Sequence, residues 1–157
     1  MITTNKTQPI LSICVPTYNR AKLLGNLLQN ISNALLDFYD DLEFCVSDND
    51  SDDETAKLLA DFKKRHDSSQ VKIFKQKSNV GSSRNIIDLC LNSTGKWILV
   101  VGDDDGFIYE ELKRTIDFLK SIQGDPWILT NLVNGHNNFK MVKVHKSNGM
   151  TLSNLQS

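Results

Sequence analysis

Short apolar runs alternate four times with amphipathic stretches along this chain, and this alternation is the feature that most constrains its fold. Short apolar runs predict buried strands, whereas apolar residues at every third or fourth position predict helices. The predicted strands cover 10–15, 42–46, 71–74 and 96–101, and the helical patterns run from Leu23 to Leu35, Leu58 to Phe62, Ile86 to Leu91 and Leu112 to Leu119. The pattern therefore predicts an α/β fold, with a mostly parallel sheet, helices on both of its faces and right-handed crossovers.

Particular residues also indicate where the predicted strands and helices begin and end. Pro16 is expected to stop the first strand, because proline cannot donate to a strand ladder. Asp52 and Asp53 suit the start of the second helix, where the helix dipole favours negative charge. A fifth strand is predicted at 127–130, and residues 139–144 fit one more strand.

Composition narrows the class of protein. The chain has 157 residues, which predicts a single domain over residues 1–157, and its net charge of -1 gives no basic field to recruit nucleic acid. The longest apolar stretch, 97–101, is too short to cross a membrane, and the first residues lack a signal peptide. The cysteines Cys14, Cys45 and Cys90 each lie in an apolar run, so we expect buried, reduced thiols in a cytoplasmic protein.

Polar clusters follow three of the predicted strands. They are Thr17 to Arg20, Asp48 to Asp53 and Asp103 to Asp105, all at strand ends where open parallel sheets bind ligands. Three adjacent carboxylates repel one another unless a positive charge lies among them, and Mg²⁺ or Mn²⁺ often bridges such groups to a diphosphate. The cluster alone leaves alternatives open, namely a solvated acidic turn or an aspartate-based phosphotransfer site.

Two common ligand-binding motifs are excluded. An EF-hand that started at Asp48 would need glycine at position 53 and glutamate at position 59, where this chain has Asp53 and Leu59. No glycine-rich phosphate loop of the dinucleotide or P-loop kind is present, which argues against an oxidoreductase or a P-loop NTPase.

Taken together, four segments resemble family 2 glycosyltransferases, which have the Rossmann-like GT-A fold. The segments are 12–20 (SICVPTYNR), 46–55 (VSDNDSDDET), 79–85 (NVGSSRN) and 95–105 (GKWILVVGDDD), within a region of similarity over roughly 10–125. Each segment is weak alone, but their order and their places at strand ends agree with the family. The resemblance implies transfer of a sugar from a nucleoside-diphosphate donor, with inversion, to a glycan or lipid-linked acceptor.

The resemblance also implies roles for particular residues. Its nucleotide-sugar-binding set comprises Pro16, Thr17, Tyr18, Arg20, Asp48, Arg84, Asp103 and Asp104. In this set Tyr18 offers a ring to the nucleobase, Asp48 accepts a hydrogen bond from a base N–H, which favours a UDP-sugar, and Arg84 lies beside the base and phosphates. The D-x-D residues Asp103 and Asp105 are the implied ligands of Mn²⁺ or Mg²⁺, with Asp105 the favoured one.

The sequence departs from the family pattern at two places. Gly102 stands where the first aspartate of the D-x-D is usual, so the motif is displaced by one position. No Asp or Glu follows Asp125, although the family's catalytic base lies well beyond the D-x-D. We therefore leave the catalytic residue unassigned and expect a chain cut short before its base, with a nucleotide-sugar-binding module without transfer activity as the alternative. Lipid-linked acceptors would bring the full protein to the inner face of the membrane, although no residue here is expected to insert.

Overall fold

The computed structural model describes residues 8–67 and 69–122, and within them strands and helices alternate as the sequence predicts. The elements are β1 (Leu11–Thr17), α1 (Ala21–Asp37), β2 (Leu42–Asp48), α2 (Thr55–Arg65), β3 (Val71–Lys75), α3 (Ser82–Asn92), β4 (Trp97–Val100) and α4 (Tyr109–Ser121). The strands expected at 127–130 and 139–144 lie outside the described residues.

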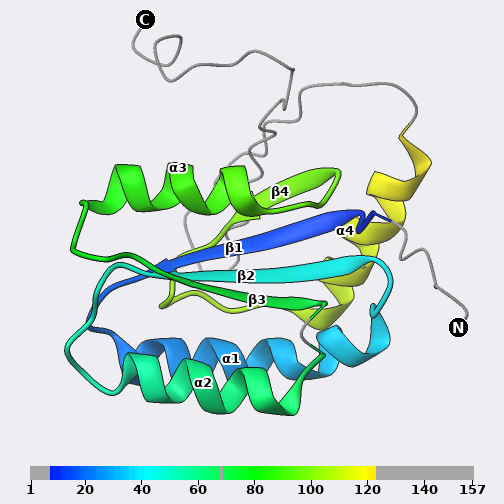
Figure 1. Ribbon diagram of the computed structural model, residues 1–157. Coiled ribbons are helices and arrows are strands. Elements are labelled where there is room, and N and C mark those ends of the chain that lie inside the picture. Colours follow the sequence, from blue (N-terminus) through cyan, green and yellow to red (C-terminus); the bar gives the residue numbers. More distant parts are fainter. Residues whose placement is uncertain (1–7, 68, 123–157) are drawn as a thin grey trace, which may run out of the picture.

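The strands form one parallel sheet with the order β3-β2-β1-β4. Leu11 of β1 pairs with Leu42 of β2 on one side and with Trp97 of β4 on the other. In Figure 1, α3 lies on one side of the sheet and α1 and α2 lie on the other. The chain winds outward from β1 to β3 and then returns to the other side of β1 for β4. The predicted α/β architecture, with helices on both faces of a parallel sheet, is confirmed for this part of the chain.

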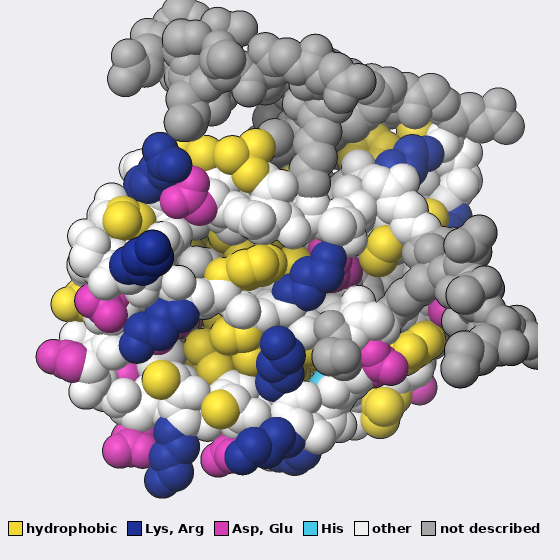
Figure 2. Space-filling view, in the orientation of Figure 1, with side chains coloured by type: hydrophobic (Ala, Val, Ile, Leu, Met, Phe, Trp, Pro, Cys, Tyr) yellow, Lys and Arg dark blue, Asp and Glu magenta, His cyan; other side chains and the backbone are white. Residues whose placement is uncertain are grey.

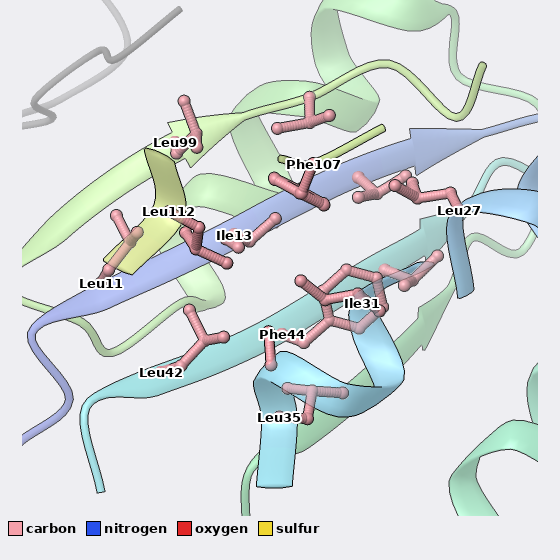
Figure 3. Close-up of a cluster of buried hydrophobic side chains, with 14 of the residues drawn as sticks. Leu11, Ile13, Leu27, Ile31, Leu35, Leu42, Phe44, Leu99, Phe107 and Leu112 are labelled. Atoms are coloured by element: carbon pink, nitrogen blue, oxygen red, sulfur yellow. The ribbon is translucent and has the colours of Figure 1, made fainter. Parts of the chain in front are cut away.

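The larger core lies between the sheet and the helices α1, α2 and α4. Alternate residues of β1 and β2 point into it, including Ile13 and Phe44, and meet Leu27 and Ile31 of α1 (Figure 3). Leu112, Ile116 and Leu119 of α4 belong to the same cluster and are fully buried. This continuous apolar layer fixes the strand ends in space, and those ends carry the polar loops described below.

The smaller core lies under α3 and contains all three cysteines. Cys14 and Cys45 are paired in register on β1 and β2, and Cys90 of α3 packs in the same cluster. All three are buried, and none of them is in a disulfide. Contacts with the Cys45 and Cys90 thiols, together with burial, raise the pKa of the Cys14 thiol well above its usual value. The expectation of buried, reduced cysteines is confirmed.

The prediction that Pro16 stops the first strand was wrong, and the register explains why. Residues of β1 alternate in the direction of their hydrogen bonds, since Cys14 accepts from Val101 on the β4 side and Thr17 accepts from Asn49 on the β2 side. Pro16 therefore faces the β4 side, where pairing has already ended at Val100. No ladder bond is lost there, so the strand continues to Thr17.

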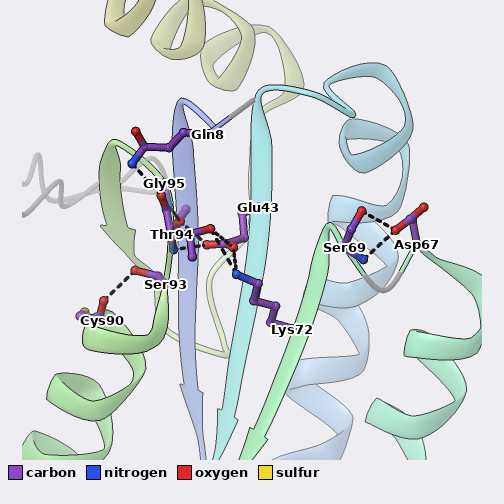
Figure 4. Close-up of polar contacts among 10 residues, drawn as sticks. Gln8, Glu43, Asp67, Ser69, Lys72, Cys90, Ser93, Thr94 and Gly95 are labelled. Carbon is purple, nitrogen blue, oxygen red and sulfur yellow. Dashed lines mark hydrogen bonds and ion pairs between the residues drawn. The ribbon is translucent and has the colours of Figure 1, made fainter. Parts of the chain in front are cut away.

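A buried ionic network closes the opposite end of the sheet (Figure 4). Glu43 is 1% exposed, and its carboxylate accepts a hydrogen bond from the Ser12 hydroxyl at 2.5 Å. It also accepts from Thr94, from the N–H at 2.7 Å and from the hydroxyl at 2.6 Å, and it forms an ion pair with the Lys72 ammonium. Burial raises the pKa of Glu43, but these donors outweigh it and lower the pKa to about 2. The network joins β1, β2 and β3 to the loop before β4, and nothing in the sequence pattern singled out Glu43.

The outer edge of β3 carries charged side chains. Lys72 is partly buried and Lys75 is exposed, and Figure 2 shows lysine and arginine side chains interspersed with hydrophobic ones over this face. Lysines on an edge strand discourage pairing with another strand.

Among the residues that the structure describes, no helix is long and apolar enough to cross a membrane.

Candidate functional site

The polar loops that follow β1, β2 and β4 meet at the carboxyl ends of the strands. β1 lies between β2 and β4, so the direction in which the chain adds strands reverses at β1, and ligands of open α/β sheets bind at such a point. Pro16 and Thr17 extend β1 beyond the end of β4, so the segment after β4 approaches the end of β1 from the side. The first and third polar clusters of the sequence are therefore in direct contact.

Asp103 is the centre of that contact. Its side chain is only 4% exposed, and one carboxylate oxygen accepts a hydrogen bond from the Thr17 hydroxyl at 2.7 Å. The other oxygen accepts from Nη1 of Arg20, also at 2.7 Å. A buried carboxylate is costly without such donors, so Asp103 is held by the β1 loop. The expectation that three adjacent aspartates require a nearby positive charge is met in this structure by Arg20.

Arg20 contacts a second aspartate as well. The same Nη1 lies 3.3 Å from Oδ2 of Asp104, and the side chains of Arg20 and Asp104 are 47% and 50% exposed. The hydrogen bond to Asp103, the charge of Asp103 and the charge of Asp104 together raise the pKa of Arg20. Arg20 thus bridges one buried and one half-exposed carboxylate.

Asp104 and Asp105 converge over Gly102. A Cβ atom placed on Gly102 would lie 2.8 Å from Oδ1 of Asp104 and 2.9 Å from Oδ2 of Asp105, closer than real Cβ contacts. The Gly102 N–H donates to that same Asp105 oxygen at 3.0 Å. Gly102 therefore leaves space for two carboxylates to approach one point, and an aspartate at position 102 would displace them.

Asp48, the last residue of β2, shapes the second loop. It is 2% exposed, and its Oδ1 accepts the Ser51 N–H at 2.9 Å. This turn places Asp50 at a φ of 68°, a left-handed conformation that glycine adopts more easily. The adjacent Asn49 accepts the Val80 N–H at 3.0 Å, which ties the third polar segment to this loop.

The first and second loops are also joined to each other, through residues that the motif comparison left without a role. Asn19, at a φ of 53°, accepts the Asp52 N–H at 2.9 Å and donates its own N–H to the Ser51 hydroxyl. Asp53 accepts the first N–H of α1 at 3.0 Å and the first N–H of α2 at 2.9 Å. The prediction that Asp53 lies at the start of the second helix is confirmed, and its carboxylate also accepts at the start of the first helix. The shape of the site thus depends on Asn19 and Asp53.

Two predicted site residues stand apart from the Asp103 contact. Tyr18 is 44% exposed, so its ring is accessible at the end of β1. Arg84, in the first turn of α3, forms an ion pair of 2.8 Å with Asp88 one turn later in the helix. Of the described contacts of Arg84, none is with Thr17, Asp48 or Asp103, and its place beside the donor stays a prediction.

The residues present suit a hard divalent cation. Asp104 and Asp105 offer carboxylate oxygens near one point, and magnesium-type sites often use one or two carboxylates and complete their shell with substrate phosphates and water. Within 8–67 and 69–122, no group of three or more histidine, cysteine, aspartate or glutamate side chains is arranged to hold a metal. Among these residues, a cation at this place would have the carboxylates of Asp104 and Asp105 as its nearest ligands.

The sequence as a whole matches the model of glycosyl transferase family 2 over residues 12–155. The chain belongs to glycosyl transferase family 2. Among curated relatives, it is 29% identical over 139 residues to the abequosyltransferase RfbV of Salmonella typhimurium. It is 36% identical over 102 residues to a GalNAc(5)-diNAcBac-PP-undecaprenol beta-1,3-glucosyltransferase of Campylobacter jejuni. These alignments cover 88% and 62% of this chain but only 40% and 30% of the relatives, so the chain spans less than half of their length.

Solved structures show the same fold. S. aureus TarS in complex with UDP-GlcNAc matches with a TM-score of 0.61 and 27% identity, over 70% of this chain and 31% of TarS. The mannosyltransferase PcManGT of Pyrobaculum calidifontis, in complex with GDP-Man and Mn²⁺, matches with a TM-score of 0.62 and 23% identity, over 72% of this chain and 33% of that protein. The α/β fold of GT-A type, predicted from the sequence, is confirmed.

Proposed function

We propose that this chain forms the donor-binding part of a glycosyltransferase that takes its sugar from a UDP-sugar. The observation that carries the proposal is the contact of the β1 loop with the aspartate cluster after β4, through Thr17, Arg20 and Asp103, at the strand ends of a family 2 fold. The solved TarS complex, which holds UDP-GlcNAc, supports a uridine nucleotide as the donor.

The nucleobase end of the donor is assigned to the loops after β1 and β2. Tyr18 presents an accessible ring for stacking, next to the backbone at Pro16 and Thr17 that pairs with β2. Asp48 has one carboxylate oxygen held by Ser51, which leaves its other oxygen as an acceptor for a base N–H. Arg84 reaches the base or phosphates only if it leaves Asp88, a weak ion pair at the helix surface.

The diphosphate end is assigned to the aspartate cluster. Asp103 and Asp105 are the metal ligands that the resemblance implies, but both oxygens of Asp103 already accept hydrogen bonds from Thr17 and Arg20. We therefore propose that Asp104 joins Asp105 in binding the cation and that Asp103 holds the loop after β4 against the loop after β1. Mn²⁺ or Mg²⁺ bound there would stabilise the negative charge that develops on the diphosphate as the sugar leaves.

The reaction is a single displacement at the anomeric carbon. The acceptor hydroxyl forms the new bond to this carbon as the bond to the diphosphate oxygen breaks, and the configuration inverts. The relative that acts on an undecaprenol-linked glycan supports a lipid-linked or glycan acceptor. We assign the base that removes the hydroxyl proton to no described residue.

Thermal unfolding with nucleoside diphosphates tests the donor site. A nucleotide at a hundred times its Kd stabilises by about 2.7 kcal/mol, which raises the Tm of a chain of this size by about 5–10 °C. We expect this rise with UDP and Mn²⁺, a smaller one with chelator, and little with CDP, GDP or TDP. Asp105→Asn keeps the acceptor for the Gly102 N–H but removes the charge, and it should abolish the metal-dependent part of the rise.

Asp61→Asn is the matched control, because Asp61 lies on α2, away from the aspartate cluster, and its carboxylate contacts Lys64 at the exposed surface. It should respond to UDP and Mn²⁺ like the unmodified chain. If no nucleotide raises the Tm, the proposed donor site is wrong. If UDP binds but a UDP-sugar is not turned over with any acceptor hydroxyl, the chain is the binding module that the sequence left as an alternative.

A further inference from the structure

Arg20 occupies an unusual electrostatic position within the aspartate cluster. Its Nη1 atom contacts Oδ1 of Asp103 and Oδ2 of Asp104, whereas the other oxygen of Asp104 lies over Gly102 beside Asp105. One carboxylate, Asp104, is thus shared between the guanidinium and the point where two carboxylates converge. A cation bound at that point would have Arg20 as a close neighbour of the same sign.

The backbone of Arg20 is fixed while its side chain remains half exposed. The residue directly precedes α1, its carbonyl accepts the Leu24 N–H at 3.0 Å, and Asp53 holds the next N–H along the chain. Both ion pairs use Nη1, so the remaining donors of the guanidinium fork are oriented but not used by these two aspartates. Such a fork suits the oxygens of a diphosphate, which it can bind in a bidentate way.

These contacts have a thermodynamic consequence. In the absence of donor, Arg20 neutralises part of the cluster and repels a divalent cation that approaches Asp104. A diphosphate adds negative charge next to both cations, so it offsets their repulsion and offers the guanidinium a new partner. Metal and nucleotide then bind cooperatively, and the coupling is the same in both directions.

We propose that Arg20 is the internal counter-cation of this aspartate cluster and makes divalent-metal binding depend on a nucleoside diphosphate. This inference rests on the donor site proposed above, but it adds a residue-specific cause of coupling. Arg20 is a positioning residue in this scheme, since it acts on the metal through Asp104. A purely structural Arg20 would weaken metal and nucleotide binding alike when it is removed.

The test compares metal binding with and without nucleotide in four proteins. Arg20→Gln keeps an N–H donor for Asp103 but loses the charge, Arg20→Lys keeps the charge, and Arg114→Gln removes an exposed arginine that pairs with Glu111 at the same 2.7 Å. Calorimetry measures the Kd of Mn²⁺ alone, and the Kd of UDP in chelator and in saturating Mn²⁺. The Tm without ligand identifies any variant that fails to fold.

We expect Arg20→Gln to tighten Mn²⁺ binding without nucleotide by about fivefold or more and to reduce the coupling between Mn²⁺ and UDP by a similar factor. Arg114→Gln should stay within about twofold of the unmodified chain in every measurement, whereas Arg20→Lys should stay within about twofold only for Mn²⁺ alone, because lysine keeps the charge but loses the fork that binds the diphosphate. If Arg20→Gln weakens or leaves unchanged the binding of Mn²⁺ alone, the inference is overturned. If the unmodified chain binds no UDP, the proposed donor site fails, whereas the tightening of Mn²⁺ binding still decides the role of Arg20.

Discussion

Replacing Glu43 by alanine removes the most buried charge of the network at the amino ends of the strands. The carboxylate is 1% exposed, and its loss leaves the Lys72 ammonium without its ion-pair partner and the Thr94 N–H without its acceptor. Removing one partner of a buried ion pair typically costs about 3–5 kcal/mol, because the remaining charge stays buried without compensation. Lys72 is 29% exposed and regains some water, which favours the lower end of this range.

Urea unfolding followed by circular dichroism measures this cost. The difference in unfolding free energy is the shift of the midpoint multiplied by the m-value, and it is compared with a total of about 5–15 kcal/mol for an ordinary domain. Glu43→Gln separates charge from volume, because it fills the same space without the charge, and we expect it to cost about 2–3 kcal/mol. Glu111→Ala is the control, because the Glu111 side chain is 47% exposed and pairs with Arg114 at the surface of α4, where such pairs contribute about 1 kcal/mol or less.

Two results would refute this reasoning. If Glu43→Ala costs no more than Glu111→Ala, then the buried network does not stabilise the fold. If Glu43→Gln unfolds at the same urea concentration as the unmodified chain, then packing and not charge accounts for the loss in the alanine variant.

The remaining predictions concern pH, packing and turns. The fold lowers the pKa of Glu43 from the ordinary 4.5 to about 2. The resulting contribution of about 3 kcal/mol to the free energy of unfolding is present above pH 4.5 and is lost between pH 4.5 and 2. In this window, the stability of Glu43→Gln should therefore depend less steeply on pH than that of the unmodified chain. Gly95→Ala should destabilise by about 1–3 kcal/mol in urea, because its Cβ would lie 2.5 Å from the Ser12 hydroxyl and 2.6 Å from the Ser12 nitrogen; an unchanged midpoint would mean that the loop moves freely. Asp53→Ala removes the acceptor of the first N–H of two helices and should cost about 1–2 kcal/mol, whereas a loss below about 0.5 kcal/mol would contradict this capping role. Asp50→Gly should leave stability unchanged or raise it by up to about 1 kcal/mol, since it relieves a left-handed residue whose contact with a lysine is long and exposed; a clear fall in Tm would contradict this.

The fold was predictable because each helix and strand has a recognisable pattern in its own segment of the sequence. Apolar periodicity located every described strand and helix, and strand–helix alternation then determined that the sheet is parallel. Errors arose where a neighbour decides the outcome. Pro16 continues its strand only because β4 has already ended beside it, and a single segment does not contain this information.

The candidate site was predictable in its parts but not in its contacts. The order of the motifs predicted that Thr17, Asp48 and Asp103 lie at strand ends. In the structure, Thr17 donates a hydrogen bond to Asp103. The supporting bonds of Asn19 and Asp53 have no sequence period, because they join loops about 30 residues apart. Glu43 was overlooked for the same reason, since its partners come from three other segments of the chain.

The three aspartates of one motif differ because the fold gives each a different environment. Asp103 is turned inward, where a hydroxyl and a guanidinium hold it, whereas Asp104 is half exposed and shared between Arg20 and the space over Gly102. Like charges this close are tolerated only when their surroundings differ in this way. The absence of a side chain at Gly102 then has a physical role, because it lets two carboxylates approach one point that an aspartate would fill. The displaced D-x-D is therefore better understood as a redistribution of roles along the loop than as the loss of one ligand.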